Sequence, residues 1–87
     1  MHDQTKQIPS DRERQLQRAI VAQTLSENRD AGWSRARLET EIGEPDALTI
    51  ADALAYLEGQ GVLELDGETV RASSATLCLE ELQLIAI

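Results

Sequence analysis

Carboxylates are plentiful in this sequence, but the residues whose side chains suit catalysis or metal binding form no motif. The one cysteine, Cys78, stands among leucines, which is typical of a small buried apolar residue. The one histidine, His2, lies in a polar N-terminal stretch, and the adjacent acids Glu80 and Glu81 are typical of solvated surface. No G-x-G-x-x-G, P-loop, HExxH or paired-cysteine motif occurs. We therefore expect no enzymatic activity, no cofactor and no bound metal ion.

Charge is distributed unevenly along the chain. The net charge of −8 comes from 16 acids and 8 bases. Residues 1–37 carry seven bases and five acids, whereas residues 38–87 carry eleven acids and one base, Arg71. No lysine or arginine occurs from Leu38 to Val70. So acidic a surface repels phosphate backbones. The charge therefore disfavours a nucleic-acid partner unless one face of the protein lacks this excess of acidic side chains.

Length and composition indicate one small globular domain. The 87 residues are 41% hydrophobic and 28% charged, which is ordinary globular usage. No apolar run approaches the ~20 residues of a membrane span, so we expect no membrane partner. Residues 1–9 are polar and lack periodicity, which predicts a flexible arm without the apolar core of a signal peptide. The expected location is therefore the cytoplasm.

Three helices are predicted in the first two thirds of the chain, each with its own start signal. A capping box formed by Ser10 and Glu13 begins the first. Ser34 caps the second, and Gly43 ends it in the left-handed conformation. Pro45 suits the start of the third, which should stop near Gly59-Gln60-Gly61. The expected helices cover about residues 11–28, 35–42 and 46–58.

The period of the hydrophobic pattern then changes from that of a helix to that of strands. Asp66-Gly67 between two alternating stretches predicts a β-hairpin with a two-residue turn. Pairing across that turn sets Leu63 opposite Val70, and Leu65 opposite Glu68, on one face of the hairpin. The pairs Glu64/Thr69 and Val62/Arg71 share the other face.

The C-terminal segment, residues 73–87, is apolar around most of its circumference if it is a helix. Ser73 or Ser74 can cap it, and the Glu80-Glu81 pair interrupts the alternation that a strand would need, so we favour a helix. One small domain cannot cover so much apolar surface, which predicts a homodimer or a protein partner. The expected interface residues are Leu77, Leu79, Leu82, Leu84, Ile85 and Ile87.

The order helix, helix, tight turn, helix and Asp-Gly hairpin resembles the winged helix-turn-helix superfamily over residues 10–72. The stretch Leu54–Leu63 looks like the end of a recognition helix that runs through a glycine into the first strand of the wing. Trp33 lies where such domains place the short strand that completes a three-stranded sheet. The resemblance implies an α+β fold of transcription-regulator type, with an arm (1–9), a winged-helix domain (10–72) and an added dimerisation or docking helix (73–87).

The same resemblance implies a contact surface. In members that bind DNA, the third helix enters the major groove and the wing touches the backbone or the minor groove. The start of the second helix often lies near the backbone as well. Carried over to this chain, the contact positions are Ser34, Arg35, Arg37, Asp46, Thr49, Asp52, Ala53, Tyr56, Asp66, Gly67 and Arg71.

Two functions are compatible with these positions. A dimeric, sequence-specific DNA-binding transcriptional regulator is favoured by the resemblance. A module acting through protein–protein contacts is favoured by the charge map, because the expected recognition surface lacks the cations that phosphates require. Convergence of Arg35, Arg37 and Arg71 on one face would favour DNA, and their dispersal would favour a protein partner.

Overall fold

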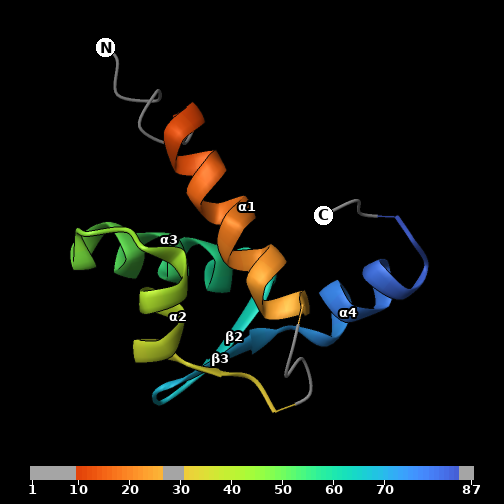
Figure 1. Cartoon of the computed structure of the whole chain (residues 1–87). Helices are drawn as coiled ribbons and strands as arrows, with labels where there is room; N and C mark the ends of the chain where they lie inside the picture. Colours follow the sequence, from red (N-terminus) through yellow and green to blue (C-terminus); the bar gives the residue numbers. More distant parts are fainter. Residues whose placement is uncertain (1–9, 27–30, 85–87) are drawn as a thin grey trace.

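The computed structural model describes residues 10–26 and 31–84. Within these ranges, helices and a three-stranded antiparallel sheet of order β1-β3-β2 form the α+β architecture that the sequence predicts. In the view of Figure 1, α2 and α3 lie on one side of α1 and α4 on the other. In the described part of the chain, no helix has the length and apolar character needed to cross a membrane. The elements are α1 (Asp11–Ser26), β1 (Trp33–Ser34), α2 (Arg35–Ile42), α3 (Ala47–Gly59), β2 (Leu63–Asp66), β3 (Thr69–Ala72) and α4 (Ser74–Glu81).

The predicted start signals of the first two helices are present, and so is the predicted glycine end of the second. Ser10 N–H donates to Glu13 Oε1 at 2.7 Å and Glu13 N–H donates to Ser10 Oγ at 3.2 Å, so the capping box is complete. Ser34 Oγ accepts from the N–H of Arg37 at 3.1 Å, and Gly43 ends α2 with φ +76°. The expected end of the first helix near residue 28 lies outside the described residues.

Helix α3 begins one residue later than Asp46, which is its N-cap. Asp46 Oδ1 accepts from the N–H of Leu48 at 3.0 Å, and Pro45 precedes the helix. The far end is closed by a Schellman motif, in which the N–H of Val62 donates to the carbonyl of Leu57 at 2.9 Å. This motif turns the chain directly into β2.

The hairpin is present, but its register differs from the predicted one. Leu65 pairs with Val70 and Leu63 with Ala72, so the two-residue turn is Gly67-Glu68 rather than Asp66-Gly67. Gly67 has φ +61° and Glu68 does not have positive φ, which fits a type II′ turn. The observed strand pairing differs from the predicted pairing by two positions. Because side chains alternate between faces with a period of two, Leu63, Leu65 and Val70 stay on the same face of the hairpin.

We expect Gly67→Val to destabilise the hairpin by about 1–2 kcal/mol, because a β-branched residue is strained at positive φ. A Cβ at Gly67 would meet no atom within 4 Å, so backbone strain is the only cost. Gly59→Ala is the matched control, since Gly59 is helical and equally unobstructed, and it should not destabilise the protein. Hydrogen exchange of the hairpin amides measures both variants; unchanged protection in Gly67→Val would contradict the turn assignment.

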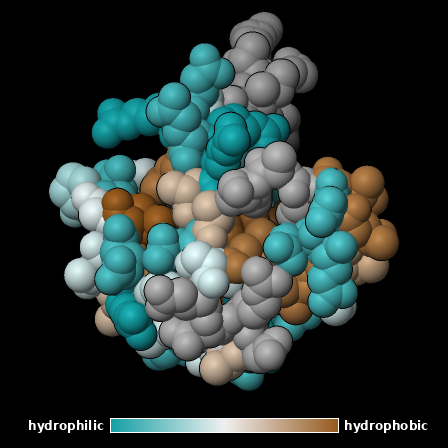
Figure 2. All heavy atoms as spheres, turned by 45° about the vertical axis from the view of Figure 1, so that its right-hand side comes forward, coloured by the Kyte–Doolittle hydropathy of each residue, from teal (hydrophilic) through white to brown (hydrophobic). Residues whose placement is uncertain are grey.

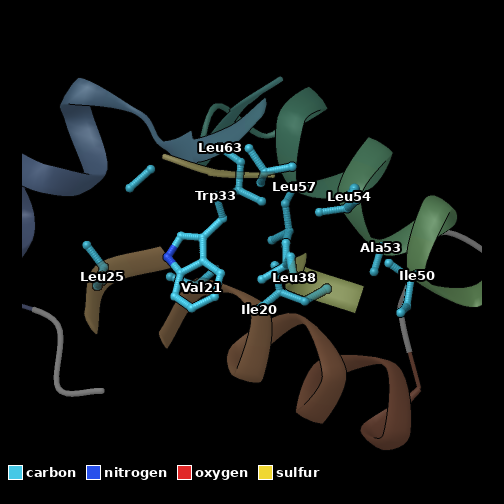
Figure 3. Packing of buried hydrophobic residues seen from close by; sticks show 12 residues of the cluster. Ile20, Val21, Leu25, Trp33, Leu38, Ile50, Ala53, Leu54, Leu57 and Leu63 are labelled. Carbon is cyan, nitrogen blue, oxygen red and sulfur yellow. The ribbon is translucent and has the colours of Figure 1, made fainter. Parts of the chain in front are cut away.

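The core lies between α1, α3 and one face of the sheet (Figure 3). Trp33 of β1 pairs with Val70 of β3, which confirms the short strand expected at Trp33. In Figure 3 the Trp33 indole lies beside Val21 of α1. The buried apolar residues are Ile20, Val21, Leu25, Trp33, Leu38, Ile50, Ala53, Leu54, Leu57, Leu63, Val70 and Ala72.

The C-terminal segment is a helix, as predicted, but a much shorter one. Helix α4 ends at Glu81 in a second Schellman motif, in which the N–H of Leu84 donates to the carbonyl of Leu79 at 2.9 Å. Gln83 takes the left-handed position, with φ +60°. The expected interface residues Ile85 and Ile87 lie outside the described residues.

Candidate functional site

The outward face of α3 differs from the predicted one. Ala53, expected to face solvent, is buried with 7% exposure, and Tyr56 is half-buried against the core. Asp52 is exposed, as predicted, and it shares its face of the helix with Leu48, with 73% exposure, and Ala55, which follow at helical spacing. This face therefore offers one carboxylate and apolar surface, without a cation.

Two of the expected contact residues on α3 are used in its N-terminal cap. Thr49 Oγ1 donates to Asp46 Oδ2 at 2.9 Å, while Asp46 Oδ1 accepts from a backbone N–H. The Thr49 hydroxyl, and after it the N–H of Leu48, hold the pKa of Asp46 below its ordinary value. A charged Asp46 is thus part of the fold, and its carboxylate oxygens are already occupied by donors.

The tip of the hairpin lies against the start of α2. The N–H of Arg35 donates to the carbonyl of Glu68 at 2.7 Å. Asp66, Gly67 and Glu68 are exposed at this tip. The contact joins two of the predicted surface segments into one surface, and its exposed tip presents carboxylates.

The three arginines on which the choice of partner depends each have an intramolecular neighbour. Arg35 Nε lies 3.4 Å from a carboxylate oxygen of Glu39, and Arg71 Nε lies 3.4 Å from one of Glu64. The guanidinium of Arg37 stacks over the Trp33 ring, 4.7 Å from its centroid. Arg35 and Glu39 thus form an i,i+4 pair on α2, whereas Arg37 contacts the Trp33 ring.

Two side-chain hydrogen bonds hold the start of α4 against the short connection between α3 and β2. Ser73 Oγ donates to the carbonyl of Gly61 at 2.6 Å, and Thr76 Oγ1 donates to that of Val62 at 2.8 Å. Thr76 is buried and Leu77 packs against the core. Leu77 is therefore a core-facing residue rather than an open interface residue.

Beyond Leu77 the outward face of α4 is apolar and open. Leu79, Leu82 and Leu84 are 41%, 61% and 67% exposed, as an interface would require. Cys78, expected to be buried, is exposed. Figure 2 brings this side of the molecule forward and shows hydrophobic surface at its right. The exposed residues Ala75, Cys78, Leu79 and Leu82 follow i, i+3, i+4, i+7 spacing, so they form one stripe, called here the α4 stripe.

An open groove of about 310 Å³ lies beside the α4 stripe. Its α1 side consists of Arg14, Gln17, Arg18 and Val21, again at i, i+3, i+4, i+7 spacing. Arg14 donates to Gln17 Oε1 at 3.4 Å and lies 5.8 Å from the Tyr56 ring centroid. Its other lining residues are Leu57, Val62, Thr76 and Leu79.

Sequence reasoning missed this groove. The helical spacing of its α1 residues was available, but two arginines and a glutamine on one face are typical of a solvated surface. The floor comes from α3, the following link and α4, which only the folded chain brings together.

Comparison with protein-family models, with curated proteins and with solved structures finds no match to this chain. Among the residues that the structure describes, no three His, Cys, Asp or Glu side chains gather as a metal site. The candidate surfaces are therefore the outward face of α3 together with the hairpin tip, called here the α3–hairpin face, and the α4 stripe with its groove.

Proposed function

We propose that this chain is a recognition module of winged-helix type, as in transcription regulators, that acts through protein–protein contacts. The observation that carries the proposal is the chemistry of the α3–hairpin face. Its exposed side chains include Leu48, Asp52 and Ala55 on α3, and Asp66 and Glu68 on the hairpin. None of these side chains is a cation, and the nearest one, Arg35, belongs to the adjoining start of α2. Neutralisation of phosphates by cations supplies most of the affinity for duplex DNA.

The architecture supports the winged-helix part of this proposal. Two short helices joined by a tight turn precede a β-hairpin, and β1 adds a third strand on the far side of β3. The bond from Arg35 N–H to the Glu68 carbonyl holds the hairpin beside the start of α2. A wing placed next to the helix-turn-helix unit is the arrangement expected of this superfamily.

The α4 stripe and the leucine that follows it support the protein-contact part. Leu79, Leu82 and Leu84 expose 41–67% of their surface. Because burying a leucine completely contributes about 1.5–3 kcal/mol, covering these three side chains is a substantial driving force. A homodimer or a partner protein bound through α4 would supply the cover.

DNA binding as a dimeric regulator is the second candidate, and one feature favours it. The start of α2 and the hairpin tip share one surface, and the Arg35 side chain lies on it, 34% exposed. Exposed ion pairs such as Arg35–Glu39 contribute only about 0–1 kcal/mol, so a phosphate can displace Glu39 at little cost.

We expect the chain to bind duplex DNA only weakly, with Kd of about 10⁻⁴–10⁻⁶ M at physiological salt. Fluorescence anisotropy with a random-sequence duplex pool, at low and physiological salt, measures this affinity. The double variant Asp52→Lys/Glu68→Lys should bind more tightly and steepen the salt dependence by about one unit for each new phosphate contact. Nanomolar binding of the unmodified chain to an enriched sequence would overturn the proposal in favour of the DNA-binding regulator.

A further inference from the structure

The α4 stripe has opposite charges on its two sides. On one side lies the groove, whose α1 edge carries Arg14 and Arg18. On the other side lies Glu81, which the helical spacing places about 100° around α4 from the middle of the stripe. Arg18 makes no ion pair within residues 10–26 and 31–84. Glu80, one turn after Thr76 on the groove side, is only half-buried, whereas Glu81 is exposed, so the exposed charged side chains run from arginine, across the apolar stripe, to Glu81.

We propose that this surface binds a second copy of the chain, with the α4 stripe of each copy seated over the groove of the other. The inference rests on the proposed function and specifies its partner. The two copies are related by a two-fold axis that runs alongside α4. Arg18 of one copy then faces Glu81 of the other, and the reverse contact occurs on the opposite side.

Charge complementarity is what identifies the occupant as a second copy. In a two-fold contact, residue i meets residue j and residue j meets residue i, so a surface that is basic on one side and acidic on the other matches itself. An acidic partner would match only Arg14 and Arg18, and a basic partner only Glu81. The chain also contains the ligand that an arginine-edged apolar groove requires, because the end of α4 and the turn after it expose leucines together with Glu81 and no base.

The backbone at the end of α4 places further leucine surface at the same contact. The hydrogen bond from Leu84 N–H to the Leu79 carbonyl belongs to the Schellman motif that ends α4. It holds the backbone of Leu84 next to the last turn of the helix. Leu79 itself lines the groove. Cys78 lies within the stripe, so an axis alongside α4 brings the two Cys78 side chains to the same height on facing helices.

Charge reversal tests the contact in the full chain. Arg18→Glu and Glu81→Arg should each raise the dimer Kd at least tenfold, because each places like charges together twice. The combined variant restores both opposite-charge contacts and should return the Kd to within threefold of the unmodified chain. Sedimentation equilibrium over a micromolar concentration series measures each Kd, with circular dichroism to verify folding. If Arg18→Glu does not fold, Arg18→Gln replaces it and should still weaken the dimer.

Matched controls change charge by the same amount elsewhere. Arg12 lies on α1 outside the groove, and Glu58 lies near the end of α3. Neither Arg12→Glu nor Glu58→Arg should change the dimer Kd. Cross-linking adds an independent measurement: a short bismaleimide should join two unmodified chains through Cys78 at low micromolar concentration. The variant Cys78→Ser/Thr40→Cys, with its thiol on the exposed surface of α2, should remain uncoupled.

The outcomes separate this inference from the proposed function. A monomer across the micromolar range overturns the homodimer. A dimer insensitive to both single reversals, or one that the combined variant does not restore, overturns this contact and leaves the proposed protein-recognition function intact. Tight binding to specific DNA would overturn the proposed function, whereas the dimer contact would still be decided by the charge-reversal measurements alone. The inference is supported if each single variant weakens dimerisation and the combined variant returns the dimer Kd to that of the unmodified chain.

Discussion

Trp33→Ala is expected to lower the free energy of unfolding by about 3–5 kcal/mol, a large part of what a domain of this size possesses. Trp33 is 2% exposed and lies in a strand of only two residues. Its indole packs beside Val21 on the core side, while the guanidinium of Arg37 covers it at 4.7 Å. Removing the ring leaves a cavity and also removes the main contact that holds β1 against the helices.

The backbone next to Trp33 is packed closely against β3. Gly32 has φ +85°, and a Cβ there would lie 2.8 Å from Thr69 Cγ2, so the chain approaches β3 more closely than a residue with a side chain would allow. Trp33→Phe should retain most of the stability because a ring still fills the site. Leu48→Ala, at a side chain 73% exposed, should change stability by no more than about 0.5 kcal/mol.

Urea denaturation followed by circular dichroism, at one fixed protein concentration, compares these three variants with the unmodified chain. A free energy of unfolding for Trp33→Ala within about 1 kcal/mol of that of the unmodified chain would show that β1 does not anchor the core.

Helix starts were predictable because a cap depends on residues within four positions of one another. Ser10 with Glu13 and Ser34 with the N–H of Arg37 are complete within the sequence that suggested them. Ser73, one of two candidate caps, accepts from the N–H of Thr76 at 3.2 Å in the same way. These interactions need no information from the rest of the fold.

The orientation of α3 was not predictable in the same way, because its apolar residues surround the helix. Leu48 and several alanines fit more than one rotation of the helix about its axis, and the sequence pattern alone does not single out Ile50 as the residue that decides between them. Ile50 is buried with Leu54 and Leu57, which turns Ala53 inward and Leu48 outward. Contacts with α1 and the sheet therefore set the rotation, overriding the local pattern.

The hairpin register and the end of α4 were missed for a different reason. The Asp-Gly signal located the turn, but Gly67 supplies positive φ equally well at either central position. Shifting the turn by one residue pairs Glu64 with Arg71 across the strands. At the end of α4, Gln83 takes a left-handed conformation that is far commoner for glycine, so no residue signalled the stop.

A chain ending at Ser74 is expected to lose about 3–5 kcal/mol of stability, because the first turns of α4 belong to the core. The truncation removes Thr76, whose hydroxyl donates to the Val62 carbonyl at 2.8 Å, and Leu77, which packs against the core. Without them, the buried end of α3 and the link to β2 become exposed to water.

The matched variant Leu82→Gln/Leu84→Gln separates the core role of α4 from its proposed role in association. These leucines are 61% and 67% exposed, so their replacement should leave the unfolding free energy of one copy almost unchanged. A two-fold dimer buries four such side chains, and covering the exposed part of each contributes about 1–2 kcal/mol, so the dimer Kd should rise roughly a thousandfold or more. Size exclusion with light scattering should therefore find a folded monomer for this variant and a dimer for the intact chain. A chain ending at Ser74 that unfolds with unchanged stability would show that α4 lies outside the core, and an intact chain that elutes as a monodisperse monomer at micromolar concentration would show that its leucines do not form an interface between copies.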